Sequence, residues 1–424
     1  MVRLLNYGLS YKNGNCDVLF VCCFFKVANF VKTDPFVHYK TQFICLIFAN
    51  KISQFLPKKI IVSVISDLVT DQRVQKECNT LHKMGFQVLL IGRKSHRNFI
   101  LKDLPYKTIR FQNLFAKGPW MYLVFNVQLF VYLLFVKADI LWSNDLDTLL
   151  PNFVISKLKK SKLIYDSHEY FTESVYKKSS KKIWELLEQQ IFPRLTNVIT
   201  VNNSIKNIYE HKYKVPVTVI RNVPHLFDKN QVANGTLLPA EKKNLIIQGM
   251  GINENRGAEE AVLMMQFLSG QFHLYFIGNG TILNKVKMIV SDLKLQSKVT
   301  FIDPLPYSEM MQITMQGFLG LIFEKIDVAD EHLFSLPNKF FDYIHAGIPV
   351  LSTEAVEIKS IITQFNIGTF VQNLNPEEMA TKVLEISEDK EKYDIWKLNT
   401  VTASKNLKWE NEEKILIDFM EHLA

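Results

Sequence analysis

Residues 335–350, which read SLPNKFFDYIHAGIPV, are the densest group of side chains in this sequence that could do chemistry. Pro337 favours the first turn of a helix, so Asn338 and Lys339 would lie at a helix N-terminus. The free backbone N–H groups there form a site for a phosphate, and Lys339 adds a mobile positive charge. Asp342 follows one turn later and could accept hydrogen bonds from ribose hydroxyls. The string therefore indicates a site for a phosphorylated nucleoside, although a merely capped helix would also account for Pro337.

Short apolar runs and amphipathic segments alternate through the body of the chain. Residues 59–66 have the pattern of a buried strand, residues 70–85 that of a helix, and residues 86–92 that of a second strand. Such a strand–helix–strand succession forms a βαβ unit, whose strands are parallel. The pattern pauses at residues 221–243 and then begins again. We therefore predict an α/β fold of two doubly wound parallel-sheet domains, with the strand C-termini at a shared cleft where such folds bind ligands.

At residues 335–350 the chain resembles the retaining glycosyltransferases of family 4, of the type that makes bacterial surface polysaccharides. The resemblance extends over residues 58–424 and implies the GT-B fold, in which two Rossmann-like domains enclose a central cleft. The implied parts are an acceptor domain at 58–222, a nucleotide-sugar donor domain at 223–408, and a C-terminal helix at 409–424 that packs back on the first domain. Residues 1–57 would be an N-terminal extension of uncertain order.

The resemblance implies a donor-binding site in the second domain. Residues 248–257 (QGMGINENRG) are similar to a loop in which a basic residue before glycine binds the donor diphosphate, so Arg256 inherits that role together with Lys339. Residues 276–280 (FIGNG) and 301–307 (FIDPLPY) resemble the next strand-turn and the segment that borders the nucleotide base. The other donor-binding residues implied are Ser335, Asn338, Asp342, Gly278, Gly280 and Phe301.

The resemblance places the acceptor side in the first domain. Residues 164–169 (IYDSHE) end a predicted strand, and His168 would face the cleft, titrate near neutral pH, and orient the sugar or the acceptor. Residues 66–73 (SDLVTDQR) resemble a loop that approaches the acceptor. Asp71 and Arg73 could instead form an ordinary surface pair. The acceptor-side residues implied are Asp67, Asp71, Arg73 and Glu169.

Two positions depart from the family pattern. Eight residues before Asp342, where the family commonly has an acid, this chain has Phe334. Six residues before Arg256, where a second basic residue is usual, it has Met250. The identity of the donor sugar is therefore open, and Arg256 and Lys339 remain as the main diphosphate ligands.

The implied reaction moves a hexose from a nucleoside-diphosphate sugar to a hydroxyl of a glycan or a lipid-linked acceptor, with retention at the anomeric carbon. Arg256, Lys339 and the helix N-terminus would stabilise the leaving diphosphate in place of a metal, so we expect no cofactor. Asp145 and Asp147 match a metal-binding Asp-x-Asp pattern, but a helix cap explains them equally well. The alternatives are an epimerase or hydrolase of the same fold, a non-catalytic nucleotide-sugar-binding subunit, and a membrane-tethered assembly protein.

Composition supports a cytoplasmic protein that binds a small anionic ligand. The formal charge is +8, and four of the five cysteines lie within residues 1–57, so the body is neither a disulfide scaffold nor a zinc domain. A dispersed excess of positive charge of this size does not indicate a nucleic-acid partner. Residues 121–136 are strongly apolar but too short to span a bilayer. They predict either a buried helix or shallow peripheral contact with an anionic membrane, at the inner face of the cell membrane.

Overall fold

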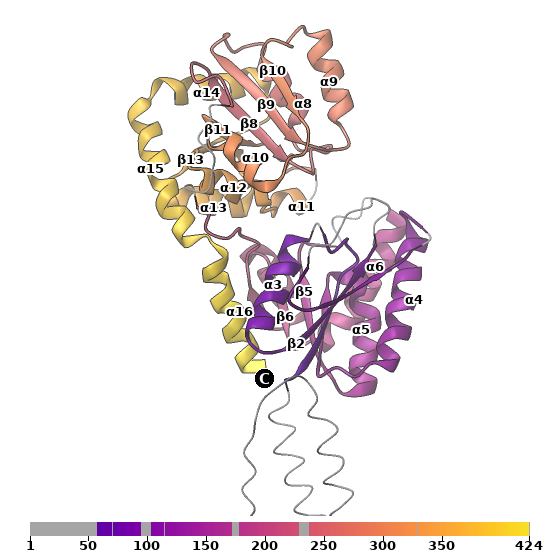
Figure 1. The fold of residues 1–424 in the computed structure, drawn as a ribbon. Helices are drawn as coiled ribbons and strands as arrows, with labels where there is room; N and C mark the ends of the chain where they lie inside the picture. Colours follow the sequence, from indigo (N-terminus) through magenta and orange to yellow (C-terminus); the bar gives the residue numbers. More distant parts are fainter. Residues whose placement is uncertain are drawn as a thin grey trace, which may run out of the picture. The chain divides into compact units, whose positions relative to one another are not determined.

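A computed structural model describes residues 57–69, 71–94, 103–113, 115–171, 178–228, 237–328 and 330–423. One compact unit begins at Lys58 and contains two parallel sheets, each with helices on both faces (Figure 1). The predicted α/β fold of two Rossmann-like domains is therefore confirmed. The predicted extension lies almost wholly outside the described residues.

The first sheet has seven strands in the order β3-β2-β1-β4-β5-β6-β7, and all neighbouring strands pair in parallel. Its first strand, KIIVS, buries Ile60 and Val62 on one face and Ile61 on the other, as expected for a strand covered on both sides. The strands are β1 (Lys59–Ser63), β2 (Gln87–Arg93), β3 (Lys107–Phe111), β4 (Ile140–Asn144), β5 (Lys162–Ser167), β6 (Val198–Thr200) and β7 (Val217–Val219).

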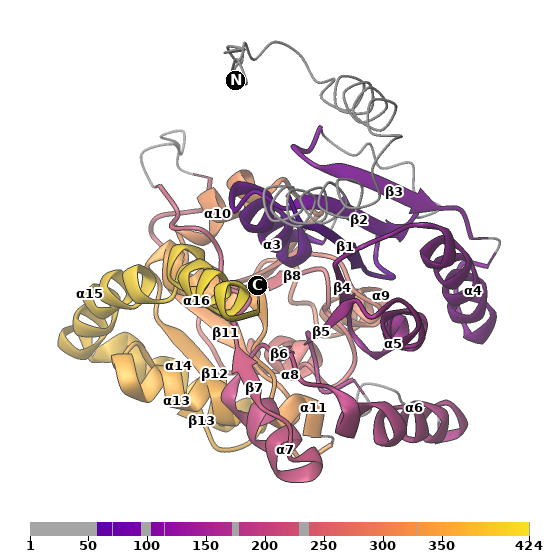
Figure 2. The same cartoon turned by 90° about the horizontal axis from the view of Figure 1, so that it is seen from below.

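Helices from both ends of the unit cover this sheet. Helix α3 (Gln72–Lys83) and the C-terminal helix α16 (Trp409–Leu423) pack on one face, where Trp409 and Leu416 join the same buried cluster as Ile60 and Val62. Figure 2 shows α16 beside α3 although they are far apart in the sequence. The other helices of this domain are α4 (Pro119–Phe135), α5 (Leu146–Lys159), α6 (Lys178–Ile191) and α7 (Asn203–Tyr213).

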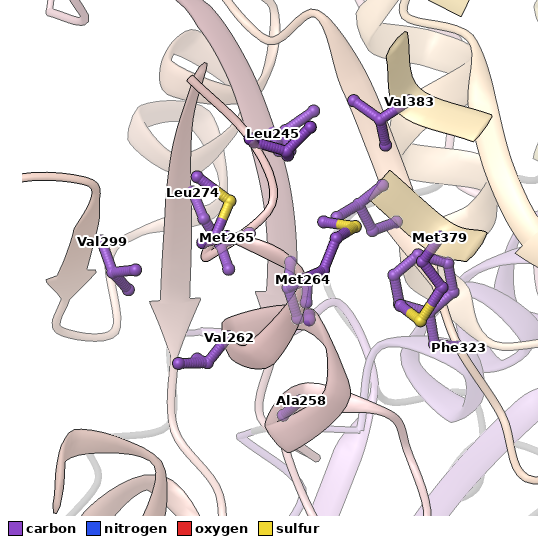
Figure 3. Packing of buried hydrophobic residues seen from close by; sticks show 14 of the residues in the cluster. Leu245, Ala258, Val262, Met264, Met265, Leu274, Val299, Phe323, Met379 and Val383 are labelled. Atoms are coloured by element: carbon purple, nitrogen blue, oxygen red, sulfur yellow. The ribbon is translucent and has the colours of Figure 1, made fainter. Parts of the chain in front are cut away.

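The second sheet has six parallel strands in the order β10-β9-β8-β11-β12-β13. They are β8 (Lys243–Gly249), β9 (Phe272–Gly278), β10 (Val299–Ile302), β11 (Leu319–Ile322), β12 (Val350–Thr353) and β13 (Gly368–Val371). The helices are α8 (Ala258–Met264), α9 (Leu283–Asp292), α10 (Tyr307–Thr314), α11 (Asp330–Leu333), α12 (Asn338–Ala346), α13 (Val356–Phe365), α14 (Pro376–Glu388) and α15 (Lys390–Asn406). Figure 3 shows one buried face of the domain, where Met264 of α8 and Met379 of α14 lie in the same apolar cluster as Leu245 and Phe323.

The strand order reverses between β1 and β4 in the first sheet and between β8 and β11 in the second. Loops on the two sides of such a reversal point in opposite directions and leave a crevice at the strand C-termini. The loops that follow β1, β4, β5, β8 and β11 therefore carry the polar side chains described below. Within the described ranges, no helix combines the length and apolar character needed to cross a bilayer.

Candidate active site

Helix α12 begins at Asn338, directly after Pro337, and no side chain caps its first turn. The helix ends at Gly347, whose φ of +82° is the left-handed conformation common at helix C-termini. Its N-terminal N–H groups are therefore available to an anion, as the sequence predicted. Burial lowers the pKa of Lys339. The nearby Glu324 carboxylate acts against this shift, and the charge of Arg256 adds to it.

Two cavities between the domains adjoin at this helix terminus. The larger one, of about 500 Å³, is lined by both domains, and Asp342, Gly278, Met250 and Lys76 lie in its wall. The smaller one, of about 290 Å³, is lined by His168, Glu169, Arg256 and Ser335 among others. Three residues line both cavities, namely Arg73, Asn222 and Asn338. The arrangement gives two compartments that meet at a single anion-binding helix end.

Asp342 lies in the larger cavity but is already hydrogen-bonded. Its Oδ2 accepts from Gln248 Nε2 at 3.1 Å, and its Oδ1 accepts from the Tyr307 hydroxyl at 3.0 Å. Burial raises the pKa of Asp342 to about 6, against the effect of both hydrogen bonds. A ribose hydroxyl would therefore share this carboxylate with Tyr307 and Gln248.

The two glycines predicted to bind the donor, Gly278 and Gly280, have different positions. Gly278 lines the larger cavity with a φ of +125°, and a Cβ there would come 2.2 Å from the Gly249 carbonyl oxygen. A Cβ on Gly280 would lie 1.9 Å from the Ile252 carbonyl oxygen, so this glycine permits close backbone packing and does not line either cavity.

Phe301 is a correction to the prediction. Its ring stacks on Phe276 at 5.2 Å between centroids and packs against the domain core, because β10 directs it away from the cleft. The same segment reaches the larger cavity a few residues later, through Pro304, Leu305 and Tyr307.

Arg256 lines the smaller cavity with 23% of its side chain exposed. Its Nη1 lies 3.0 Å from Oε1 of Glu324, which is fully buried and follows strand β11. Oε2 of Glu324 pairs with Nδ1 of the buried His332 at 2.8 Å. Although burial raises the pKa of Glu324, the hydrogen bond from His332 and the charges of Arg256 and Lys339 lower it overall. Sequence reasoning missed Glu324, whose one signal was a polar residue at a strand C-terminus.

His168 lies in a cluster of acids at the ends of β4 and β5. Its Nε2 lies 3.0 Å from Asn144 Oδ1 and 3.4 Å from Asp166 Oδ2, and its Nδ1 lies 3.6 Å from Asp145 Oδ2. Burial lowers the pKa of His168, but the Asp145 and Asp166 carboxylates outweigh it and raise the value to about 10. The two carboxylates therefore favour the protonated ring, which does not support the prediction that His168 titrates near neutral pH.

Asp145 does not cap helix α5 with its side chain, contrary to one prediction. Its Oδ1 instead accepts from the backbone N–H of His168 at 2.8 Å. The backbone φ of Asp145 is +56°, which is uncommon for a residue other than glycine. The Asp145 backbone thereby places a carboxylate against His168.

Arg73 is buried, so the alternative of a surface pair with Asp71 is wrong. Only 2% of Arg73 is exposed, its Nη2 lies 2.9 Å from Asp166 Oδ1, and its Nε lies 3.0 Å from Glu77 Oε1. Asp71 caps α3 by accepting from the backbone N–H of Val74. Ligand atoms of Glu77, Asp166 and His168 lie close enough together to hold a metal ion, but the Arg73 guanidinium already supplies the positive charge there.

The remaining acceptor-side residues lie apart from one another. Asp67 forms a 2.8 Å ion pair with Arg110 and does not line either cavity, whereas Asp71 lines the larger one and Glu169 the smaller one. Sequence reasoning missed Lys76, which is one helical turn after Arg73 and donates to Asn222 Oδ1 at 3.0 Å in the wall of the larger cavity. Burial and the charge of Arg73 lower the pKa of Lys76 to about 8.

Comparison with known proteins matches both domains. The model of Glycosyltransferase Family 4 matches residues 72–226, and that of Glycosyl transferases group 1 matches residues 234–401. No curated protein matches the chain significantly.

Solved structures of low sequence identity share the fold over nearly their whole length. Sucrose-phosphate synthase from Thermosynechococcus elongatus has a TM-score of 0.70 at 14% identity, over 86% of this chain and 99% of that one. HepE from Anabaena, solved in complex with UDP-glucose, has a TM-score of 0.63 at 12% identity, over 86% and 100%. WaaG, a glycosyltransferase involved in lipopolysaccharide biosynthesis, has a TM-score of 0.62 at 14% identity, over 84% and 98%.

Proposed function

Because this chain is a glycosyltransferase of the GT-B family, we propose that it moves a hexose-type sugar from a nucleoside-diphosphate sugar to a hydroxyl of a glycan or lipid-linked acceptor. The observation that carries the proposal is the pair of cavities that meet at the α12 N-terminus. The nucleoside would occupy the larger cavity, the diphosphate the helix end, and the sugar the smaller cavity. The UDP-glucose complex of the structurally similar HepE supports a nucleotide sugar as donor.

The leaving diphosphate would be stabilised by fixed positive charge. Arg256 lines the smaller cavity, and both Arg256 and Lys339 are close enough to the buried Glu324 to affect its pKa. A preorganised donor of this kind typically lowers a barrier by about 3 kcal/mol because it needs no reorganisation during the reaction. We propose that these groups and the helix N-terminus suffice without a metal, and that transfer retains the anomeric configuration.

His168 would act as a fixed cation beside the sugar and not as a general base. A group with a pKa of about 10 is protonated throughout the neutral range, so its ring N–H groups only donate. Their direction is set by Asn144, Asp145 and Asp166. The imidazolium would orient a sugar or acceptor hydroxyl and add positive charge near the leaving group.

The experiment combines binding with turnover. Nucleoside diphosphates are first screened by thermal shift, since a ligand that binds only the folded state raises its stability. Release of that nucleotide from its sugar conjugates is then measured with and without glycan and lipid acceptors, in EDTA. We expect acceptor-dependent release that EDTA does not reduce, and a product whose anomeric configuration by NMR matches that of the donor.

Other outcomes of this experiment identify the alternatives. Conversion of the nucleotide sugar at the same rate without any acceptor indicates an epimerase or hydrolase. Binding without turnover under all conditions indicates a non-catalytic subunit. A strict need for a divalent metal contradicts the proposed mechanism and favours metal binding by Asp145 and Asp147.

We also propose that the protein works in the cytoplasm at the inner face of the cell membrane, with helix α4 against an anionic bilayer. This helix has no charged residue and buries one face through Met121, Phe125, Leu129 and Leu133. A soluble helix normally has a polar outer face. Here the exposed side chains are instead apolar at helical spacing, namely Trp120, Leu123, Val127, Val131, Leu134 and Phe135.

The surroundings of α4 favour a lipid surface. Tyr122 of α4 packs against Trp184 of α6, and α6 exposes Ile183 and Leu186 nearby. The exposed Lys117 and Lys137 precede and follow α4. Apolar side chains bordered by lysines are the pattern of helices that lie in the interface of an anionic membrane.

Vesicle flotation tests this contact. The full chain should float with vesicles of phosphatidylglycerol and phosphatidylethanolamine, and much less with phosphatidylcholine alone. The variant Val127→Glu/Val131→Glu should lose flotation, whereas Met288→Glu, on an equally exposed apolar side chain of α9, should not. Flotation that survives the double variant contradicts the proposal. A dimer that dissociates in that variant would instead show that a second copy covers α4.

A further inference from the structure

The two cavities of the cleft meet at Arg73, Asn222 and Asn338, which line both of them. The guanidinium of Arg73 is committed within its own domain. Its Nη2 lies 2.9 Å from Asp166 Oδ1, and its Nη1 donates to the Ile220 carbonyl at 2.8 Å. Asn338 begins helix α12, whose first-turn N–H groups are open to an anion. The remaining residue at this junction is Asn222.

The amide of Asn222 has its direction set by Lys76. Lys76 Nζ lies 3.0 Å from Asn222 Oδ1 and 2.5 Å from the carbonyl oxygen of Val223. An ammonium group only donates hydrogen bonds, so the Asn222 atom that faces it must be the oxygen. The amide nitrogen, Nδ2, has no hydrogen-bond partner in the part of the chain that the structure describes. Its two N–H groups are therefore left for a ligand in the cavities that Asn222 lines.

Lys76 is itself held where the chain crosses between the domains. Its Nζ lies 5.1 Å from the ring centroid of Trp409, the first residue of helix α16. The backbone N–H of Trp409 donates to the Pro224 carbonyl at 2.8 Å, which joins the returning chain to the outgoing one. The Asn222 amide is thus fixed before any ligand arrives, and a donor fixed in this way needs no reorganisation on binding.

We propose that Asn222 donates a hydrogen bond to the diphosphate of the donor, and that Lys76 is the positioning residue that turns the amide nitrogen toward it; this rests on the proposed function. That function places the nucleoside in one cavity, the sugar in the other, and the diphosphate at the junction between them, where Asn222 and the α12 N-terminus lie. A hydrogen bond to an ionised group such as a phosphate is stronger than one between neutral groups. The segment that joins the two domains thereby contacts the donor directly.

The experiment measures binding by calorimetry. UDP, GDP, CDP, ADP and dTDP are compared first, and the tightest of them is carried forward with its nucleoside, which is measured by competition. Asn222→Ala should weaken binding of the diphosphate about tenfold, because a hydrogen bond to a charged group is lost. Binding of the nucleoside should stay unchanged, because it lacks the phosphates that Asn222 contacts.

The variant Asn222→Asp separates a binding role from a merely structural one. It keeps an oxygen for Lys76 but replaces the N–H groups with a second, negatively charged oxygen. If Asn222 serves only to hold Lys76, the diphosphate binds this variant as well as the native protein, and the proposal fails. If Asn222 binds the diphosphate, affinity should fall roughly a hundredfold, below that of Asn222→Ala, because like charges then meet.

A matched control carries the same change of charge. Asn284→Asp alters an exposed residue of α9 that lines neither cavity, and it should bind the diphosphate like the native protein. Thermal melting of each variant checks that it is folded.

Lys76→Met tests whether Lys76 acts through Asn222. It should weaken binding of the diphosphate roughly fivefold, because an amide that is free to turn must be ordered by the ligand. The double variant Lys76→Met/Asn222→Ala should bind no more weakly than Asn222→Ala alone, since the two residues contribute one contact. Losses that add would show that Lys76 contacts the phosphates itself, which overturns its positioning role.

The two proposals fail in different ways. If a nucleoside diphosphate binds native protein and Asn222→Ala equally well, the inference about Asn222 is wrong while the proposed function stands. If none of the five nucleoside diphosphates binds the native protein, the proposed function itself is wrong.

Discussion

The two sides of the cleft each hold an arginine among acids, but the two arginines have different surroundings. Arg73 of the first domain is 2% exposed and contacts the Asp166 carboxylate and Glu77, whose pKa burial raises to about 8. Arg256 of the second domain is 23% exposed and pairs with the carboxylate of Glu324. A fully buried cation paired with a buried carboxylate mainly holds its own domain together, even where it borders a cavity. A partly exposed cation in a cavity wall can still attract an anionic ligand.

The largest effect should come from the donor side. Arg256→Ala together with Lys339→Ala should reduce kcat by roughly ten-thousand-fold, because each preorganised donor is worth about 3 kcal/mol of transition-state stabilisation. The melting temperature should fall only modestly, because His332 still pairs with the buried Glu324. Steady-state kinetics and calorimetry measure the two quantities, with Lys285→Ala, on an exposed cation of α9, as the control. Near-native turnover in the double variant would remove Arg256 and Lys339 from the mechanism.

The next effect should come from Arg73 and should be on stability. Arg73→Ala leaves the Asp166 carboxylate buried without its cation, which typically costs about 3–5 kcal/mol of unfolding free energy. Urea unfolding measures it. Lys83→Ala, on the same helix but 68% exposed, should cost less than about 0.5 kcal/mol. An Arg73→Ala protein as stable as the Lys83→Ala protein would mean that the two sides of the cleft do not differ in this way.

A third prediction concerns the pH dependence of stability through His168. The folded-state pKa is about 10, above the ordinary value of about 6.5. A raised histidine pKa stabilises the fold fully below pH about 6.5, and this contribution is lost as the pH rises through about 10. The unfolding free energy of the native protein should therefore exceed that of His168→Gln most at pH 6, and the difference should shrink by pH 10. A difference that grows with pH would show that the ring is neutral.

The smallest effect should come from Tyr307, which donates to Asp342 on the donor side. Tyr307→Phe removes one hydrogen bond, worth about 1 kcal/mol, and should raise the KM for the nucleotide sugar about fivefold with little change in kcat. Tyr393→Phe removes a comparable hydroxyl that donates to the Phe318 carbonyl away from both cavities, and should leave KM unchanged. Equal KM values for the two variants would show that Asp342 does not bind the nucleoside.

The sequence predicted those parts of the fold and site that depend on neighbouring residues. Apolar runs located β1 and β2, and the Pro337 to Gly347 string located helix α12 to within a residue. Strand β3, with the mixed pattern KTIRF, was not predicted because its side chains are only partly buried.

The features of the site that the sequence did not predict are interactions between residues far apart in the chain. Arg73 pairs with Asp166, 93 residues away, so no local pattern distinguishes it from an exposed arginine. The pKa of His168 depends on Asp145 and Asp166, which come from two different strands. The partners of Glu324 lie on separate loops, and the strand-end position of Glu324 alone does not identify them.

Helix α16 makes the first domain discontinuous, which has a consequence for biosynthesis. Trp409, Leu416 and Met420 belong to the same buried cluster as Ile60 on strand β1. Chains generally fold from the N-terminal end while they emerge from the ribosome. This domain cannot complete its core in that order, because its last apolar layer is synthesised after the entire second domain. The nascent first domain must therefore wait with one face of its sheet incompletely covered until α16 has been synthesised.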